Sequence, residues 1–137
     1  MDDIIKTMRI SRAGMRAQGS RLRVISQNIA NVSSLPQEPG GKPYQRKLIT
    51  FKNVLDRSIG LETVRTGKVQ VDRSEFKKIY QPSHPAADPD GYVLTPNVNS
   101  LLEMTDMREA QRSYEANLSA IKVSKGMLNQ TIDLLRR

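Results

Sequence analysis

The chain has 137 residues, a length typical of one domain, and its 22 basic residues against 14 acidic ones give a formal net charge of +8. It has no cysteine, which excludes disulfides, thiolate zinc sites and a cysteine nucleophile, and its lack of tryptophan and low aromatic content (4%) disfavour a compact enzyme with a deep pocket. The positive charge leaves nucleic acid or an anionic membrane surface open as a partner.

An apolar heptad repeat predicts a long helix at the N-terminus. Two lines of residues carry it, the second three positions after the first: Met1, Met8, Met15, Leu22 and Ile29, then Ile4, Ile25 and Val32. This spacing is typical of a coiled-coil seam. Ser11 and Gln18 interrupt the second line, and Gly14 and Gly19 each cost about 1 kcal/mol relative to alanine. We therefore expect the first seam to be weak.

The middle of the chain has a different composition from both ends. All seven prolines and five of the six aromatic residues lie between residues 36 and 96. Proline-free ends around a proline-rich middle predict a long helix at each terminus and a β-rich or irregular insertion between them. A loop is expected at 81–99, with a turn at Asp90 and Gly91. Short strands are expected at 44–51, 61–72 and 76–80.

A second and stronger apolar seam lies near the C-terminus. Its two lines are Met107, Tyr114, Ile121, Leu128 and Leu135, and Met104, Leu118 and Ile132. Asn99 or Ser100 is expected to cap the start of this helix. Glu103 and Asp106 suit its first turns because acidic side chains favour the positive end of the helix dipole.

These elements together predict the fold class and the domains. We expect a mainly α, elongated molecule in which two long terminal helices pair as an α-helical coiled coil around a small β-rich insertion. Residues 1–33 together with 98–137 are expected to form one discontinuous helical domain. Residues 34–97 are expected to be the linker and the insertion.

The sequence contains no motif that indicates catalysis or metal binding. His84 is the only histidine and lies in a proline-rich loop, and a single histidine does not form a metal site. The run "DPDG" (88–91) begins like a calcium loop, but Asn99 stands where such a loop needs a glutamate, so a plain turn is favoured. A glycine-rich phosphate loop and a nucleophile elbow are both missing. We therefore expect no enzyme, no cofactor, no metal and no small-molecule substrate.

An arginine stripe on the first helix leaves two interpretations open. Arg9, Arg16 and Arg23 share one heptad position, with Arg12 beside them. Such a helix can bind phosphates, and nucleic-acid binding is therefore the alternative function. A solvated or partner-facing stripe is favoured, because no helix-turn-helix follows and no aromatic residue is near to stack on bases. Membrane-surface binding ranks lower, because large aromatic anchors are missing.

Two segments resemble a known protein family. "SRAGMRAQGSRLRVISQNIANVSS" (11–34) is similar to the N-terminal signature of bacterial flagellar rod and hook proteins, in which an amphipathic helix ends in Asn-Ile-Ala-Asn-Val. Residues 96–135 resemble their C-terminal helix, with an Arg-Ser-Tyr-x-Ala-Asn element from Arg112 to Asn117. The chain length and the segment 84–99 narrow the resemblance to the proximal rod proteins of this family.

The resemblance implies a structural subunit of the flagellar basal body that assembles helically into the torque-transmitting shaft, with the helical domain in its inner tube. It implies four kinds of partner: other proximal and distal rod proteins, the protein at the junction of rod and MS ring, copies of the chain itself, and the flagellar type III export apparatus. Nucleic acid is not among them. It also implies a place in the periplasmic rod after export without a cleaved signal peptide. The absence of a leader pattern and of cysteines agrees with this.

The seams and the resemblance together give the residues expected at subunit interfaces. They are Met8, Met15, Leu22, Ile25, Asn28, Ile29, Asn31, Val32, Met107, Arg112, Tyr114, Asn117, Leu118, Ile121, Leu128, Ile132 and Leu135. Asn28 and Asn31 are expected to satisfy backbone groups at the helix end and to bond to neighbouring subunits, with a simple helix cap as the alternative. The polar breaks and glycines predict terminal helices that are weakly ordered in the monomer and fold on incorporation.

Overall fold

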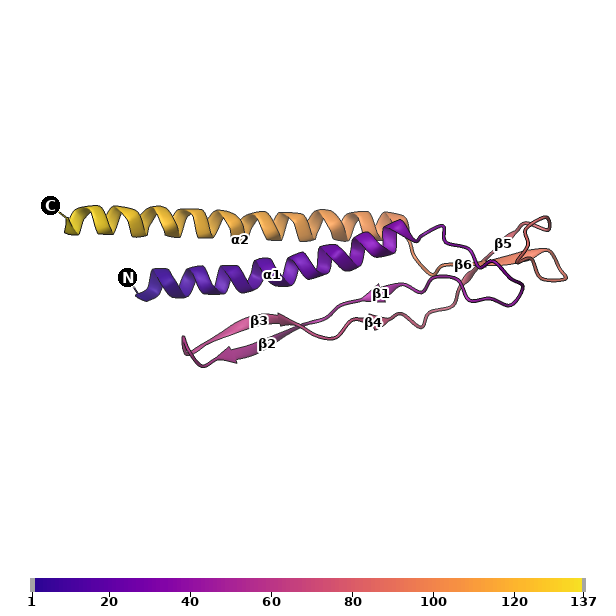
Figure 1. Ribbon diagram of the computed structural model, residues 1–137, viewed down its shortest axis with the longest axis horizontal. Helices are drawn as coiled ribbons and strands as arrows, with labels where there is room; N and C mark the ends of the chain where they lie inside the picture. Colours follow the sequence, from indigo (N-terminus) through magenta and orange to yellow (C-terminus); the bar gives the residue numbers. More distant parts are fainter. Residues whose placement is uncertain (1, 137) are drawn as a thin grey trace. The chain divides into compact units, whose positions relative to one another are not determined.

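The computed structural model describes residues 2–136, so Met1, expected at the start of the first seam, and Arg137 lie outside the described residues. Helix α1 (Asp2–Ala30) and helix α2 (Ser100–Leu135) occupy the two ends of the chain, with short strands between them in sequence (Figure 1). The prediction of two terminal helices is confirmed. The helices have 29 and 36 residues, less than half of the chain, so the description as mainly α is not confirmed.

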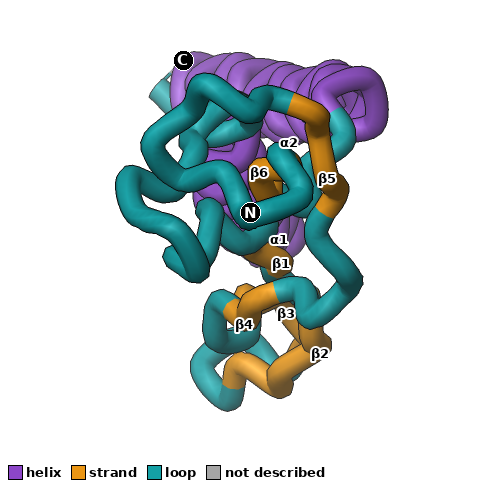
Figure 2. Tube along the Cα trace, turned by 90° about the vertical axis from the view of Figure 1, so that its right-hand side faces the viewer, coloured by secondary structure: helices purple, strands orange, loops and turns teal. Residues whose placement is uncertain are grey.

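The described strands form three separate antiparallel pairs. Figure 2 shows these strands in orange. The pairs are β1 (Lys47–Leu48) with β4 (Gln70–Val71), β2 (Phe51–Asp56) with β3 (Leu61–Thr66), and β5 (Lys77–Tyr80) with β6 (Tyr92–Thr95). Two-stranded ribbons are marginal by themselves and need packing against other elements.

Three of the expectations for the middle of the chain need correction. The single strand expected at 44–51 is divided, because β1 ends at Leu48 and β2 begins at Phe51, and the two strands pair with different partners. The single strand expected at 61–72 is interrupted after β3, where the Gly67 N–H donates to the carbonyl of Thr50 at 2.8 Å and closes the β2–β3 ribbon. The expected loop 81–99 contains β6, which the turn signals around it obscured. The turn at Asp90 and Gly91 is confirmed, because Gly91 has a φ of 86° and its N–H donates to the carbonyl of Asp88 at 2.9 Å.

The chain divides into two compact units, and each contains part of both helices. Unit 1 consists of Met1–Leu22, Thr50–Lys68 and Arg108–Arg137, and unit 2 of Arg23–Ile49 and Val69–Met107. This division follows different boundaries from those expected from the sequence. A helical domain distinct from the insertion stays a prediction.

In unit 1, α1 and α2 run antiparallel with small and polar residues at their closest contacts. A Cβ atom built on Gly14 would lie 2.7 Å from Oδ1 of Asn117, and further along α1 Arg21 reaches the carboxylate of Glu109 at 3.5 Å. Ala110 and Ser124, each seven residues from Asn117, are buried. Small side chains allow helices to approach closely, because the interaxial distance depends on the side chains at the contact. A coiled coil with the large apolar residues at its centre is therefore not confirmed.

In unit 2 the buried side chains come from the end of α1, the start of α2 and the segment around β6. The apolar ones are Val24, Ile25, Ala86, Val93 and Val98. Asn28 and Glu103 are as deeply buried as these, although both are polar. Buried polar groups require partners within the protein.

Candidate functional site

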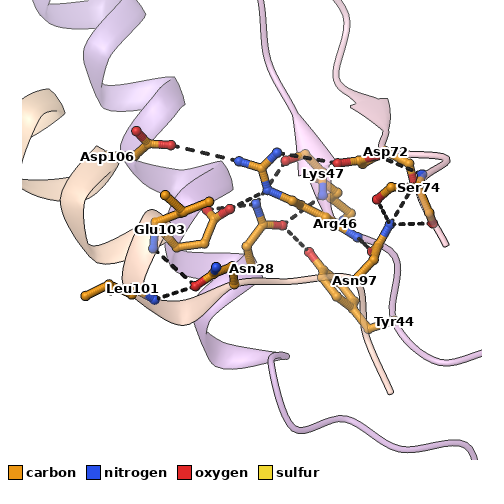
Figure 3. Close-up of polar contacts among 12 residues, drawn as sticks. Asn28, Tyr44, Arg46, Lys47, Asp72, Ser74, Asn97, Leu101, Glu103 and Asp106 are labelled. Carbon is orange, nitrogen blue, oxygen red and sulfur yellow. Dashed lines mark hydrogen bonds and ion pairs between the residues drawn. The ribbon is translucent and has the colours of Figure 1, made fainter. Parts of the chain in front are cut away.

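A buried polar cluster lies in unit 2, where α1 ends and α2 begins (Figure 3). At its centre the Asn28 side chain donates to Glu103 Oε2 at 3.1 Å and to the carbonyl of Lys47 at 2.9 Å. Its Oδ1 atom accepts from the Lys47 N–H at 2.8 Å and from the Tyr44 hydroxyl at 2.9 Å. A primary amide offers two donors and two acceptor positions, so every hydrogen-bonding position of Asn28 is used within the chain.

Arg46 supplies the positive charge that balances Glu103. The Glu103 side chain is 1% exposed, and its Oε1 atom accepts from Arg46 Nε at 2.5 Å. The other arginine nitrogens lie 3.5 Å from a carboxylate oxygen of Asp72 and 3.9 Å from one of Asp106, as Figure 3 shows. Burial by itself lowers the pKa of Arg46, but the hydrogen bonds and charges of Glu103 and Asp72 outweigh it and raise that pKa. The arginine therefore stays charged.

Tyr44 is held protonated at the edge of the same cluster. Burial, and then the charge of Glu103, raise the pKa of its phenol. The hydroxyl therefore remains a hydrogen-bond donor to Asn28, which matches the direction of the bond in the structure.

Asn97 extends the cluster to the segment after β4. Its Oδ1 atom accepts from the Arg46 backbone N–H at 2.7 Å, and its Nδ2 atom donates to the carbonyls of Asp72 at 3.0 Å and Ser74 at 3.1 Å. The backbone N–H of Ser74 donates to Asp72 at 2.9 Å, and this bond is the main cause that lowers the pKa of Asp72. We call Asn28, Tyr44, Arg46, Asp72, Asn97 and Glu103 the polar clasp, because they join four segments of unit 2.

Asparagines also complete the ends of both helices. Asn99 accepts from the N–H groups of Leu101 at 3.1 Å and Leu102 at 3.5 Å, which confirms its predicted role as a cap. Asn31 donates to the carbonyl of Gln27 at 2.8 Å, so this side chain satisfies a backbone group at the end of α1 as expected. Asn28 bonds instead to residues outside α1.

The polar clasp is suited to holding segments together and not to chemistry. Its acids and its arginine are paired with one another, and its two central residues are almost inaccessible. Among residues 2–136, no group of three or more His, Cys, Asp or Glu side chains is placed to hold a metal ion. In the same part of the chain, neither helix is long and apolar enough to cross a membrane.

The residues expected at subunit interfaces lie in three environments. Ile25 and Asn28 are buried, and Arg112, Ile132 and Leu135 are exposed. The others are half-buried: Met8, Met15, Leu22, Ile29, Asn31, Val32, Met107, Tyr114, Asn117, Leu118, Ile121 and Leu128. Large apolar side chains at half-buried and exposed positions have apolar surface left to cover.

Helix α2 exposes more apolar surface than the heptad lines indicated. Its exposed large apolar residues are Leu101, Leu102, Met104, Val123, Met127, Ile132, Leu134 and Leu135. Five of these fall outside the predicted lines, because those lines follow a strict seven-residue repeat. A single exposed leucine is ordinary, but eight large apolar residues leave α2 with much apolar side-chain surface exposed.

The pairing of Arg46 with Glu103 was not predicted from the sequence. The two residues are 57 positions apart and carry no local pattern that links them. A signal was present on α2, where Glu103 stands seven residues before Ala110 in a line of small and polar residues. That repeat marks the side of the helix that faces the rest of the chain.

Comparisons with known proteins agree with one another. A family model described as "Flagellar basal body rod FlgEFG protein C-terminal" matches residues 90–134. The chain is similar to the flagellar basal-body rod protein FlgC of Agrobacterium fabrum, with 47% identity over 136 residues, 99% of this chain and 98% of that protein. It is also similar to FlgC of Salmonella typhimurium (35% over 127 residues, 91% and 92% of the two chains) and of Bacillus subtilis (32% over 143 residues, 93% and 95%).

Proposed function

Because the chain belongs to the FlgC family and is a structural subunit of the flagellar basal-body rod, we propose that the exposed apolar residues of α2 are its main contacts with neighbouring rod subunits. The chain is not an enzyme, since its relatives are structural rod proteins. Nothing supports the alternative of a nucleic-acid-binding protein.

The observation that carries this proposal is the exposure of large apolar side chains along α2. Leu134 and Leu135, at the end of the helix, are 72% and 75% exposed, and Leu101, at its start, is 71% exposed. Burying such a side chain contributes about 1.5–3 kcal/mol, so a few of them in one interface provide a substantial driving force for assembly. The half-buried residues of both predicted seams would be covered at the same time.

The finer features of the function are part of the proposal. The chain would stand in the proximal rod, arranged helically with itself, with other rod proteins and with the protein at the junction of rod and MS ring. It would reach the periplasm through the flagellar type III export apparatus without cleavage of a signal peptide. The presence of flagellar rod proteins among its partners follows from the family itself.

The two asparagines near the end of α1 differ in what they contribute to an interface. The amide of Asn28 is fully bonded within the chain, so its substitution would act on the fold of unit 2. Within residues 2–136, the Asn31 side chain is bonded only to nearby residues of its own segment. We therefore expect Asn31→Ala to test an intersubunit contact more cleanly, and normal rod assembly at normal subunit levels would rule that contact out.

We also propose that the terminal helices gain order on incorporation. Gly14, Gly19 and the buried Gln18 Oε1 atom, which has no hydrogen-bond partner within residues 2–136, all weaken α1 in the isolated chain. Weak order would limit premature assembly, because the apolar faces would not be presented in a fixed arrangement. Full protease protection of both ends in the isolated subunit would contradict this.

The proposed function is tested by electron microscopy of basal bodies from the source bacterium with this gene deleted and then restored on a plasmid. Rings without a rod, rescued by the plasmid, are expected. In the same strain, Ile121→Asp would place a charge on a half-buried apolar contact and is expected to abolish assembly. Rod-bearing basal bodies in the deletion strain would contradict the proposed role of the subunit. A swimming Ile121→Asp strain would contradict the proposed role of this residue.

A further inference from the structure

A groove of about 590 Å³ lies in unit 1 between α1 and the β2–β3 hairpin. Its strand wall consists of residues 63–66 of β3. Alternate residues of a strand point to opposite faces, so four consecutive residues line one groove only if it runs along the edge of the strand. Within the described chain β3 pairs only with β2, which leaves the other edge of β3 without a strand partner. The groove can therefore receive a backbone as well as side chains.

The helix wall of the groove is strongly basic. Arg9, Arg12 and Arg16 line it from α1, and Arg65 adds a fourth guanidinium from β3. Arg9 is engaged, since it donates to the Ser58 hydroxyl at 2.8 Å. Within residues 2–136, Arg12 and Arg16 make no hydrogen bond or ion pair. On the helix wall, two guanidinium groups thus line the groove without a counter-charge of their own.

The acidic residue in the groove does not neutralise these arginines. Asp56 accepts from the Ser58 hydroxyl at 2.7 Å and from the Ser58 backbone N–H at 3.0 Å. These bonds, more than the charges of Arg9 and Arg65, lower the pKa of Asp56, so its carboxylate is already charged and bonded. One carboxylate against four guanidinium groups leaves the lining with a net positive charge.

The distribution of charge between the units identifies the kind of partner. Unit 1 contains 15 basic and 7 acidic residues, whereas unit 2 contains 7 of each, so the whole net charge of +8 belongs to unit 1. A second copy of the chain would bring to the groove either a unit with a net charge of +8 or a unit with no net charge. A different and acidic protein is electrostatically better suited. A lipid headgroup would engage the arginines but would leave the strand edge unpaired.

The spacing of the free arginines fits an extended segment. Arg12 and Arg16 are four residues apart, which is about 6 Å along a helix. Alternate residues of a β-strand are about 6.6 Å apart and point to the same side. We propose that the groove binds an extended acidic segment of a non-identical rod subunit, which pairs with the free edge of β3 and places alternate carboxylates against Arg12 and Arg16. This inference rests on the proposed function, because the partner that it assigns to the groove is another rod subunit.

Site-specific photo-cross-linking in assembled basal bodies tests the inference. Benzoylphenylalanine is introduced at Val64, or in a second variant at Thr66, both of which line the groove. Purified basal bodies are irradiated, and the attached peptide is sequenced by mass spectrometry. We expect a segment of a different rod protein with at least two carboxylates at alternate positions. Attachment to lipid, to a second copy of this chain or to a segment without carboxylates would overturn the proposal.

A matched pair of charge reversals shows whether the groove arginines are responsible for binding the cross-linked segment. Arg16→Glu is expected to reduce the cross-link yield at least tenfold. Arg23→Glu makes the same charge change at an exposed arginine of the same helix that does not line the groove, and should change the yield less than twofold. Replacing the captured carboxylates by lysine should restore the cross-link to the Arg16→Glu chain. Equal losses from both reversals would refute a groove-specific role.

Failure of the inference and failure of the proposed function look different in this experiment. Immunoblots of the same basal bodies report whether the chain is present in the rod at all. Absence of the unsubstituted chain would contradict the proposed function. Its presence with cross-links to a non-acidic segment would contradict only the role of the arginine groove.

Discussion

The salt bridge inside the polar clasp gives the sharpest prediction about stability. Arg46→Met removes the charge that balances Glu103, a carboxylate that is 1% exposed. Breaking a buried ion pair in this way costs about 3–5 kcal/mol, and the lower end applies because the Arg46 side chain is 24% exposed. We expect a loss of about 3 kcal/mol in the free energy of unfolding of unit 2. This is a large fraction of the 5–15 kcal/mol of a typical domain.

A double-mutant cycle separates the ion pair from the packing of the side chains. Glu103→Met leaves Arg46 with Asp72 and Asp106, so we expect a loss of only about 2 kcal/mol. The double variant leaves no unpaired buried charge and should also lose about 2–3 kcal/mol, giving a coupling energy of about 2–3 kcal/mol. Arg73→Met changes an exposed arginine of the same unit and should stay within about 0.5 kcal/mol of the original chain.

Urea unfolding followed by tyrosine fluorescence measures these changes. Tyr44, Tyr80 and Tyr92, three of the four tyrosines, belong to unit 2, so the signal reports mainly on that unit. With a urea m-value of about 2 kcal/mol per M, Arg46→Met should lower the midpoint by about 1.5 M. The reasoning would be refuted if the stability loss of the double variant equalled the sum of the two single losses. It would also be refuted if the urea midpoint of Arg46→Met equalled that of Arg73→Met.

Three further predictions concern the helices and the response to acid. In Gly19→Ala the new Cβ has no atom within 4 Å, so the variant should gain about 1 kcal/mol of stability and a higher thermal midpoint in circular dichroism. In Gly14→Ala the new Cβ meets an α2 side chain at 2.7 Å, so the gain in stability should be at least about 1 kcal/mol smaller. Equal gains would contradict the close contact between the helices. Gln18→Met removes a buried acceptor without a partner in the described chain and should stabilise unit 1 by about 1–2 kcal/mol in urea unfolding, and a loss would show that this atom is satisfied. The backbone and side-chain hydrogen bonds of Ser74, and then Arg46, hold the pKa of Asp72 below its usual range, so the stability that Asp72 contributes is present at neutral pH and lost as the pH falls through its pKa in the folded chain. Unfolding midpoints measured below about pH 4 should therefore fall more steeply in the original chain than in Asp72→Asn, and parallel curves would contradict this.

The sequence was sufficient to predict the helices but not their contact. Proline distribution and heptad spacing placed α1 and α2 correctly, because both are local properties of the chain. The same spacing suggested that the large apolar residues face the partner helix. Instead, Gly14, Asn117 and Ala110 lie at or near the contact in unit 1, since small residues permit the closest approach of the backbones. In a subunit of an assembly, a line of apolar residues on a helix can face another chain as readily as the partner helix of its own chain.

The polar clasp could not be predicted because its partners come from distant segments. Each of its central residues has an ordinary local explanation. Asn28 lies near the end of a helix, Arg46 lies next to a strand, and Glu103 is an acid in the first turn of a helix. Only the fold brings them within hydrogen-bonding distance. By contrast, the cap at Asn99 and the turn at Gly91 depend on neighbouring residues and were correctly predicted.

The central claim, that other rod subunits cover the exposed apolar residues of α2, is tested most directly by chemical labelling. The chain has no cysteine, so Leu135→Cys and Met127→Cys each introduce a single thiol at an exposed apolar position, and Lys122→Cys provides an exposed polar control on the same helix. The rate of maleimide labelling is measured in the isolated subunit and in purified basal bodies. We predict at least tenfold slower labelling at Leu135 and Met127 in the rod, with a smaller change at Lys122. Apolar positions that label as fast in the rod as in the isolated subunit would contradict the account.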